Sequence, residues 1–244
     1  MKWLVITVPL LLLIGCGTPG HDKQSADTSD LRVADAAMAS GLPQTALSVT
    51  RDILQADPRN IGALLRQGDA LVAMGQTDAA EECYLRVIEI EPRSADGLRG
   101  LGRVALAMGD ARKAEASFRK TLDDSPNDAA ALNDLGIALD LQERHDEAQA
   151  AYHAALTRQP AMAAARVNLG LSLALAGATD RALAILQPLA SDPGADSRVR
   201  QNLAVALALA GDEAQARRVL SADMPQETIA SALAGYVALK VSAK

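Results

Sequence analysis

The chain repeats one pattern of apolar, small and helix-breaking positions about every 34 residues between residue 27 and about residue 224. An alanine recurs in every unit at Ala46, Ala80, Ala114, Ala148, Ala182 and Ala216. A second small residue recurs at Ala34, Gly68, Gly102, Gly136, Gly170 and Ala204. Helix-ending glycines fall at Gly41, Gly75, Gly109, Gly177 and Gly211, with Glu143 in the remaining unit. Prolines fall at Pro58, Pro92, Pro126 and Pro160, with Pro193 one residue early. Because the series agree in phase, they indicate six structural repeats.

Each unit is predicted to form two helices joined by a tight turn. In the fourth unit Leu132, Leu135 and Leu139 stand at helical spacing and give the first helix one apolar stripe. Ala148 and Tyr152 stand four residues apart, which places them on one face of the second helix. The glycine ends the first helix, and the proline ends the second because it disfavours helix at the residue before it. One such pair cannot bury its apolar face alone, so the pattern predicts stacked pairs.

This pattern resembles the tetratricopeptide (TPR) repeat. The resemblance implies an all-α fold, a TPR solenoid in which about six helix-turn-helix repeats form a right-handed superhelix with a C-terminal capping helix. The repeats are expected near 27–60, 61–94, 95–128, 129–162, 163–196 and 197–224. Asp30 and Val33 replace large apolar residues in the first repeat, which is therefore expected to be a polar cap. A last helix of about 227–239 is expected to cover the other end, within a capping helix and tail at 225–244.

Composition agrees with a helical protein and excludes one class of partner. Apolar residues make up 49% of the chain but aromatic residues only 2%, so most are alanine, leucine and valine, of which the first two are strong helix formers. The formal net charge is -6. Without residues 1–15, which carry one lysine and no acid, it is about -7. Such a surface does not attract phosphate backbones, and we expect no nucleic-acid partner.

The N-terminus has the pattern of a secretory signal. Lys2 precedes a short apolar stretch, residues 3–14, which Pro9 interrupts and which is too short to span a bilayer. Its end, LIGC at residues 13–16, resembles the lipobox of bacterial lipoproteins, which implies a signal peptide at 1–15 and a lipidated Cys16. Ordinary cleavage near Gly17 is the alternative. By the same resemblance, Gly17 after the cysteine suggests the outer membrane, facing the periplasm. Residues 16–29 are predicted to be the lipidated cysteine and a flexible tether.

No residue pattern predicts catalysis, a metal site, a cofactor or a small-molecule substrate. His145 and His153 stand eight residues apart without a further ligand in the repeats and are expected to be exposed polar residues. The glycine-rich stretch GLRGLGR at 97–103 follows no strand, so it lacks the setting of a phosphate loop. Cys83 has no histidine within a repeat of it. A small buried side chain explains Cys83, and a reactive thiol is the alternative. We therefore expect no enzyme.

By the TPR resemblance, the first helix of each repeat lines a concave groove with its positions 2, 5, 6, 9, 12 and 13. In repeats 2 and 3 these positions hold charged residues, namely Arg66, Asp69, Arg99 and Arg103. In repeats 5 and 6 they hold Val167, Leu171, Leu175, Val205 and Leu209, flanked by Asn168, Gln201 and Asn202. The apolar set is surplus to the packing positions and predicts a site for an amphipathic helix or a peptide with apolar anchors. The asparagines could hold a peptide backbone and the arginines an acidic end. The alternative is that the capping helix or the curvature covers these leucines.

One known mode of TPR binding does not fit this sequence. The carboxylate clamp of chaperone-binding TPR proteins needs Lys and Asn in one repeat, Asn in the next, then Lys and Arg. The best match here begins with Arg99 and Arg103, but Asp134 stands where the asparagine is needed, followed by Ala164 and Asn168. Asp134 has the wrong charge, so capture of a C-terminal carboxylate in this mode is not expected.

Lipobox, tether and six repeats together resemble the TadD family, the TPR lipoproteins of the tight-adherence (Tad, or Flp) pilus system. The most specific part is RVRQNLAVALALAGDEAQARRVLSADMP at 198–225. The resemblance implies an outer-membrane-anchored, pilotin-like adaptor. Its protein partner would be a segment of the pilus secretin or another Tad outer-membrane component. The alternative is an adaptor that regulates envelope proteases or peptidoglycan enzymes.

Overall fold

The computed structural model describes the backbone of residues 20–242 and the side chains of residues 29–237. In this part the chain forms thirteen α-helices and no strand. They are α1 (Gly20–Ala39), α2 (Pro43–Ala56), α3 (Ile61–Ala73), α4 (Thr77–Ile90), α5 (Ala95–Ala107), α6 (Ala111–Asp124), α7 (Ala129–Asp140), α8 (His145–Arg158), α9 (Ala163–Leu175), α10 (Thr179–Ala190), α11 (Ser197–Ala210), α12 (Glu213–Leu220) and α13 (Gln226–Ser242). The predicted all-α solenoid of helix-turn-helix repeats is confirmed.

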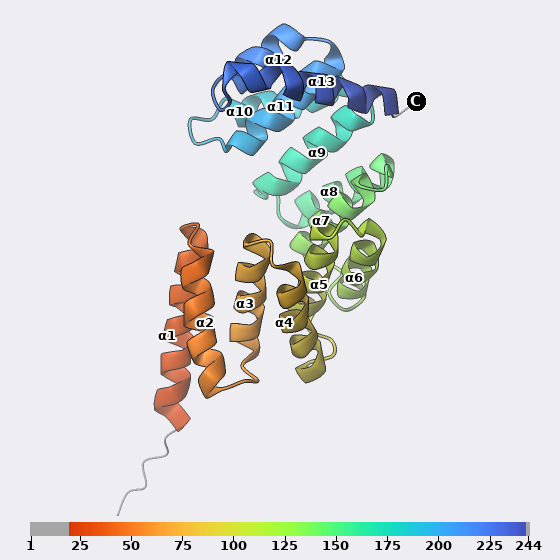
Figure 1. Ribbon diagram of the computed structural model, residues 1–244. Coiled ribbons are helices and arrows are strands. Elements are labelled where there is room, and N and C mark those ends of the chain that lie inside the picture. Colours follow the sequence, from red (N-terminus) through yellow and green to blue (C-terminus); the bar gives the residue numbers. More distant parts are fainter. Residues whose placement is uncertain (1–19, 243–244) are drawn as a thin grey trace, which may run out of the picture.

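The helix pairs stack in chain order, from α1 and α2 to α11 and α12 (Figure 1). Each even-numbered helix packs on the odd-numbered helix before it and on the one after it. Odd-numbered helices also pack against one another from repeat to repeat, which places them on the inner side of the curve. The helices of the first repeats run at a steep angle to those of the last repeats (Figure 1). The odd-numbered helices therefore line the groove that the sequence predicts.

The turn within each repeat depends on one residue with a positive φ. Five repeats use a glycine at this position, with φ between 70° and 93°. The fourth repeat uses Glu143, at φ 61°. The left-handed conformation costs a residue with a Cβ atom roughly 1–2 kcal/mol, so Glu143 adopts it under strain. Its side chain is exposed to solvent, so packing does not offset the strain.

The second small position of the repeat lets an aromatic ring lie against a helix backbone. A Cβ atom on Gly136 would lie 2.4 Å from Cε1 of Tyr152, and one on Gly102 would lie 2.4 Å from Cε1 of Phe118. Both rings are fully buried. In the fifth repeat Leu186 fills the place of the ring over Gly170. The two helices of each pair can approach this closely only because the residue beneath the large side chain is small.

The N-terminal helix begins earlier than the sequence predicts. Helix α1 starts at Gly20, so residues 20–29, expected to belong to a flexible tether, are helical. No proline or glycine interrupts the chain between Gly20 and Gly41, and the packed end of α1 can therefore extend towards the N-terminus. The signal region and Cys16 lie outside the described residues.

The last helix of the described residues, α13, follows the sixth helix pair. Helix α13 packs on α11 and α12, as the first helix of a seventh repeat would, and buries Ile229 and Leu233. Helix α12 has 8 residues, whereas the second helices of the other repeats have 12 to 14. Helix α13 begins at Gln226, close to the predicted start at 227.

Replacing Glu143 by glycine is expected to stabilise the protein. The substitution removes the left-handed strain of about 1–2 kcal/mol and adds the entropy cost of a glycine, about 0.5–1 kcal/mol, so the net gain is about 0.5–1 kcal/mol. Urea unfolding followed by circular dichroism measures this difference. Gly109→Ala is the matched control. The added Cβ atom would meet no atom within 4 Å, so only the cost of a positive φ for a residue with a side chain remains. A loss of stability in Glu143→Gly would contradict the assignment of strain.

Candidate protein-binding groove

A cleft of about 550 Å³ lies on the inner side of the solenoid, between α9 and α11. Four residues that the sequence places in the groove line this cleft: Val167, Asn168, Gln201 and Asn202. The other lining residues are Ala163, Ala164, Asp196, Arg198 and Val199. Of these, Ala164 and Arg198 stand at the second position of their repeats, which the resemblance places in the groove. The cleft is therefore lined by apolar side chains, by side-chain amides and by the ion pair of Arg198 with Asp196.

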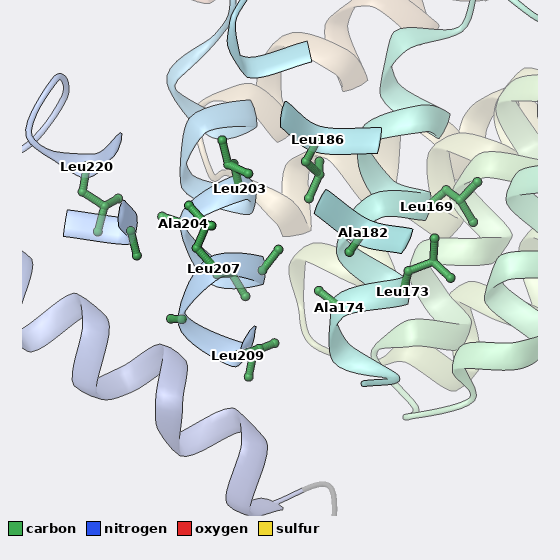
Figure 2. Packing of buried hydrophobic residues seen from close by; sticks show 14 of the residues in the cluster. Leu169, Leu173, Ala174, Ala182, Leu186, Leu203, Ala204, Leu207, Leu209 and Leu220 are labelled. Atoms are coloured by element: carbon green, nitrogen blue, oxygen red, sulfur yellow. The ribbon is translucent and has the colours of Figure 1, made fainter. Parts of the chain in front are cut away.

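The prediction that Val205 and Leu209 are exposed in the groove is wrong. Their exposed fractions are 7% and 6%, and both belong to the core of the last repeats. Helix α11 is flanked by α9 on one side and α13 on the other, and both pack against it. Figure 2 shows Leu209 on the last turn of α11, with α9 and its Leu173 across from that helix. Neighbouring helices therefore cover Val205 and Leu209. The sequence left this coverage open as the alternative to an exposed apolar groove.

Leu171 and Leu175 are half-buried and pack against the same core. They stand at the groove positions of α9 that correspond to Val205 and Leu209 of α11. The usable apolar surface of the groove is thus smaller than the sequence predicts. Val167 and Val199 line the cleft, whereas Leu171 and Leu175 are not part of its lining.

Side-chain amides follow the groove from the cleft towards the middle of the molecule. Asn168 donates a hydrogen bond from Nδ2 to Oδ1 of Asn133 at 2.9 Å. Asn133 in turn donates to Oδ1 of Asp134 at 3.2 Å. Gln201 and Asn202 make no side-chain hydrogen bond within the described part of the chain. Their amides are available to a backbone or side chain placed in the cleft.

The arginines of the groove are already paired with acidic residues of the same chain. Arg103 contacts Asp69 at 3.0 Å. Arg99 contacts Asp96 at 2.9 Å and Asp128 at 3.5 Å. Arg66 pairs in the same way with Asp35 of the preceding repeat, at 2.7 Å. The expectation that Arg99 and Arg103 receive an acidic end of a partner therefore does not fit the structure.

Asp134 has no comparable partner. It stands on α7 in the middle of the groove and makes no ion pair among the described residues, where its one hydrogen bond comes from Asn133. Burial raises the pKa of its carboxyl, and the neighbouring charge of Asp128 raises it further. Arg99 and Arg103 of α5 lower the pKa, but they are engaged elsewhere and do not reverse the shift.

A second polar cluster, which the sequence did not reveal, joins repeats 4 and 5. Asp140 accepts hydrogen bonds from the hydroxyls of Tyr152 at 2.9 Å and Ser172 at 2.7 Å. His145 Nδ1 lies 2.8 Å from the same carboxylate. The side chain of His145 is half-buried, whereas the sequence predicted an exposed histidine. Burial, with Asp140 beside it, raises the pKa of the Tyr152 hydroxyl and keeps it a donor. The cluster fixes the orientation of α9 against α7.

The described residues show neither a metal-binding cluster nor an ionised thiol. They contain no group of three or more His, Cys, Asp or Glu side chains that could hold a metal ion. Cys83 is buried, and its thiol lies 3.3 Å from Oε1 of Gln67. Burial raises the pKa of this thiol to about 11, so it is protonated and weakly nucleophilic at neutral pH. Within residues 20–242, no helix is long and apolar enough to cross a membrane.

The contrast between core and cleft predicts two different stability effects. Leu209→Asp places a carboxylate in the core and is expected to lower the free energy of unfolding by more than about 3 kcal/mol. Val167→Asp changes a half-buried wall of the cleft and is expected to cost about 1 kcal/mol or less. Urea unfolding of both variants measures the difference. Equal costs, or the reverse order, would contradict this division of the surface.

Asp134→Asn is expected to stabilise the protein at neutral pH. Because the pKa of Asp134 is raised in the folded protein, the fold favours the protonated carboxyl. This stabilising contribution is fully present below the ordinary pKa of an aspartate. That contribution is lost as pH rises through the raised pKa. The neutral amide should therefore raise the melting temperature by about 2 °C or more at pH 7 and leave it unchanged at pH 3. The control Asp52→Asn, on the exposed side of α2, should change neither value, and an equal gain at both pH values would refute the prediction.

Comparison with known proteins agrees with the geometry of the repeats. The Tetratricopeptide repeat family model matches residues 65–129, 99–148 and 142–196. No curated protein sequence matches the chain. The structure is similar to PilW, described as a widely conserved type IV pilus biogenesis factor, with a TM-score of 0.70 and 21% identity over 84% of this chain and 98% of that one.

Two further solved structures share the arrangement. A thermophilic TPR protein of Thermus thermophilus, TTC0263, has a TM-score of 0.68 and 21% identity, over 74% of this chain and 98% of that one. The pilF protein of Pseudomonas aeruginosa has a TM-score of 0.65 and 14% identity, over 82% and 93%. At these identities the likeness concerns the fold alone. The family matches together span residues 65–196, more than half of the chain, and the chain therefore belongs to the tetratricopeptide repeat family.

Proposed function

We propose that this TPR protein is a pilotin-like adaptor, lipid-anchored at Cys16 to the outer membrane and facing the periplasm. Its groove binds a segment of the secretin, or of another outer-membrane component, of a Tad (Flp) pilus. The lipid holds the solenoid at the membrane, and the groove raises the local concentration of the bound segment there. The function is that of a protein-interaction scaffold, as in TPR proteins generally.

The observation that carries the proposal is the cleft between α9 and α11. Its walls offer the apolar side chains of Val167 and Val199, and its edges offer the unengaged amides of Gln201 and Asn202. Apolar anchors together with a few placed polar groups are what a peptide site needs. Part of the cleft lining also belongs to the TadD-like segment at 198–225. The fold is shared with PilW, a type IV pilus biogenesis factor, and with pilF, which supports a role in pilus assembly.

Complementation of a deletion strain tests the groove and the anchor separately. Val167→Asp places a charge in the cleft at a cost of at least about 1.4 kcal/mol, a factor of about ten in affinity. The variant should stay in the membrane fraction but lower the amount of assembled secretin in the outer membrane. Cys16→Ser should lower it too, because the protein leaves the membrane fraction. Immunoblots of fractionated membranes measure both proteins.

A matched control keeps the experiment specific. Leu85→Asp introduces the same charge at an exposed position of α4, where Leu85 is 47% exposed, and should leave the secretin unchanged. Membrane retention of Cys16→Ser would overturn the anchor. Normal secretin assembly with Val167→Asp, at normal levels of the variant, would overturn the role of the groove.

A further inference from the structure

The groove carries a negative charge that the chain does not neutralise. Among the ion-paired residues of its N-terminal and middle parts, together with Asp134, three are arginines and five are aspartates, which leaves a formal charge of -2 for this set. The residues are Arg66, Arg99, Arg103, Asp35, Asp69, Asp96, Asp128 and Asp134. Each arginine contacts at least one of these carboxylates, whereas Asp134 makes no ion pair within the described chain. The sequence alone suggested the opposite sign.

Asp134 is the acid of this set that makes no ion pair within the described part of the chain. An ionised carboxylate accepts about four hydrogen bonds, and Asp134 receives one within the described chain, from the amide of the adjacent Asn133. The cations nearest to it, on α5, are held by Asp69, Asp96 and Asp128. A basic side chain delivered by a ligand would supply the charge-assisted hydrogen bonds that the fold does not provide.

The acid is connected to the apolar cleft by a line of amides. Asn168 lines the cleft and donates to Asn133, which donates to Asp134. These contacts run across the odd-numbered helices from α9 to α7. A segment lying along this line would meet apolar walls at one end and a carboxylate at the other.

We propose that the segment bound in the groove is extended and basic, with one Lys or Arg side chain on Asp134 and apolar side chains in the cleft between α9 and α11. This inference rests on the proposed function, since it specifies the chemistry of the same site. An extended backbone leaves its N–H and C=O groups open to the amides of Gln201 and Asn202, whereas a helix satisfies them internally.

The geometry also sets the spacing within the segment. Asn168 of α9 lines the near side of the cleft and Asp134 stands on α7, so the cleft and the acid are one to two helix spacings apart. Packed helices lie about 8–10 Å apart, which gives roughly 10–20 Å. An extended chain rises about 3.3 Å per residue, so the basic residue should stand about three to six residues from the apolar ones.

Synthetic peptides test this directly with the full-length protein in detergent. Each fluorescein-labelled probe carries a Leu-Leu pair and one Arg, Gln or Glu, separated by two to fourteen Gly, Ser or Thr residues. Fluorescence anisotropy should show the Arg probe binding about tenfold tighter than the Gln probe at a spacing of about three to six, and the Glu probe weakest. Asp134→Asn should remove the advantage of Arg and leave the Gln probe unchanged. Asp52→Asn, outside the groove, should change nothing.

The outcomes separate this inference from the function on which it rests. Binding of the Glu probe as tight as that of the Arg probe would overturn the basic partner while leaving the groove as a peptide site. An Arg advantage that persists in Asp134→Asn would overturn the role of Asp134, and one found only at spacings of about seven to thirteen, as in a helix, would overturn the extended conformation. If no probe binds at any spacing, the groove is not a site for linear segments, and the proposed function fails with the inference.

Discussion

The structure depends on the contact between a small residue of one helix and a large side chain of the next. Gly136 beneath Tyr152 and Gly102 beneath Phe118 let the two helices of a repeat approach until the rings touch backbone. The pair still leaves an apolar face that only the following repeat can cover. The core is therefore a continuous layer between odd- and even-numbered helices, and its stability comes from neighbours rather than from one central cluster. A groove on the inner side follows from this stacking.

Polar contacts then fix how successive repeats sit against one another on the inner side. Arg103 with Asp69, Asn168 with Asn133, and Ser172 with Asp140 each join residues 32 to 35 positions apart. The ion pair of Arg103 with Asp69 is half-exposed and contributes modestly to stability. The ion pairs between repeats also affect the groove. They engage the arginines and leave Asp134 without a counter-ion in the described part of the chain. The charge that a partner meets is thus decided by contacts between repeats.

The sequence predicted the helices and their ends well because each end has a local cause. A left-handed glycine such as Gly109 ends a first helix, and a proline such as Pro126 follows the end of a second. The early start of α1 was missed because nothing in residues 20–29 marks the start of a packed helix. The burial of Val205 and Leu209 was foreseen only as the alternative, because it depends on α13, which packs on α11 and lies outside the 34-residue pattern. The pairing of Arg103 with Asp69 was missed although the two residues stand one period apart, because the repeat pattern does not show which side chains meet across repeats.

The ninth position of the first helix shows how the groove changes along its length. It reads Asp35, Asp69, Arg103, Ile137, Leu171 and Val205 from the first repeat to the sixth. The polar half is ion-paired within the chain, and the apolar half is progressively buried until Val205 is covered. The surface left for a ligand is therefore the transition between the halves, where Asp134 and the cleft of α9 and α11 lie one to two helix spacings apart. Because the two ends of this surface differ in chemistry, a segment that fits it has one preferred direction.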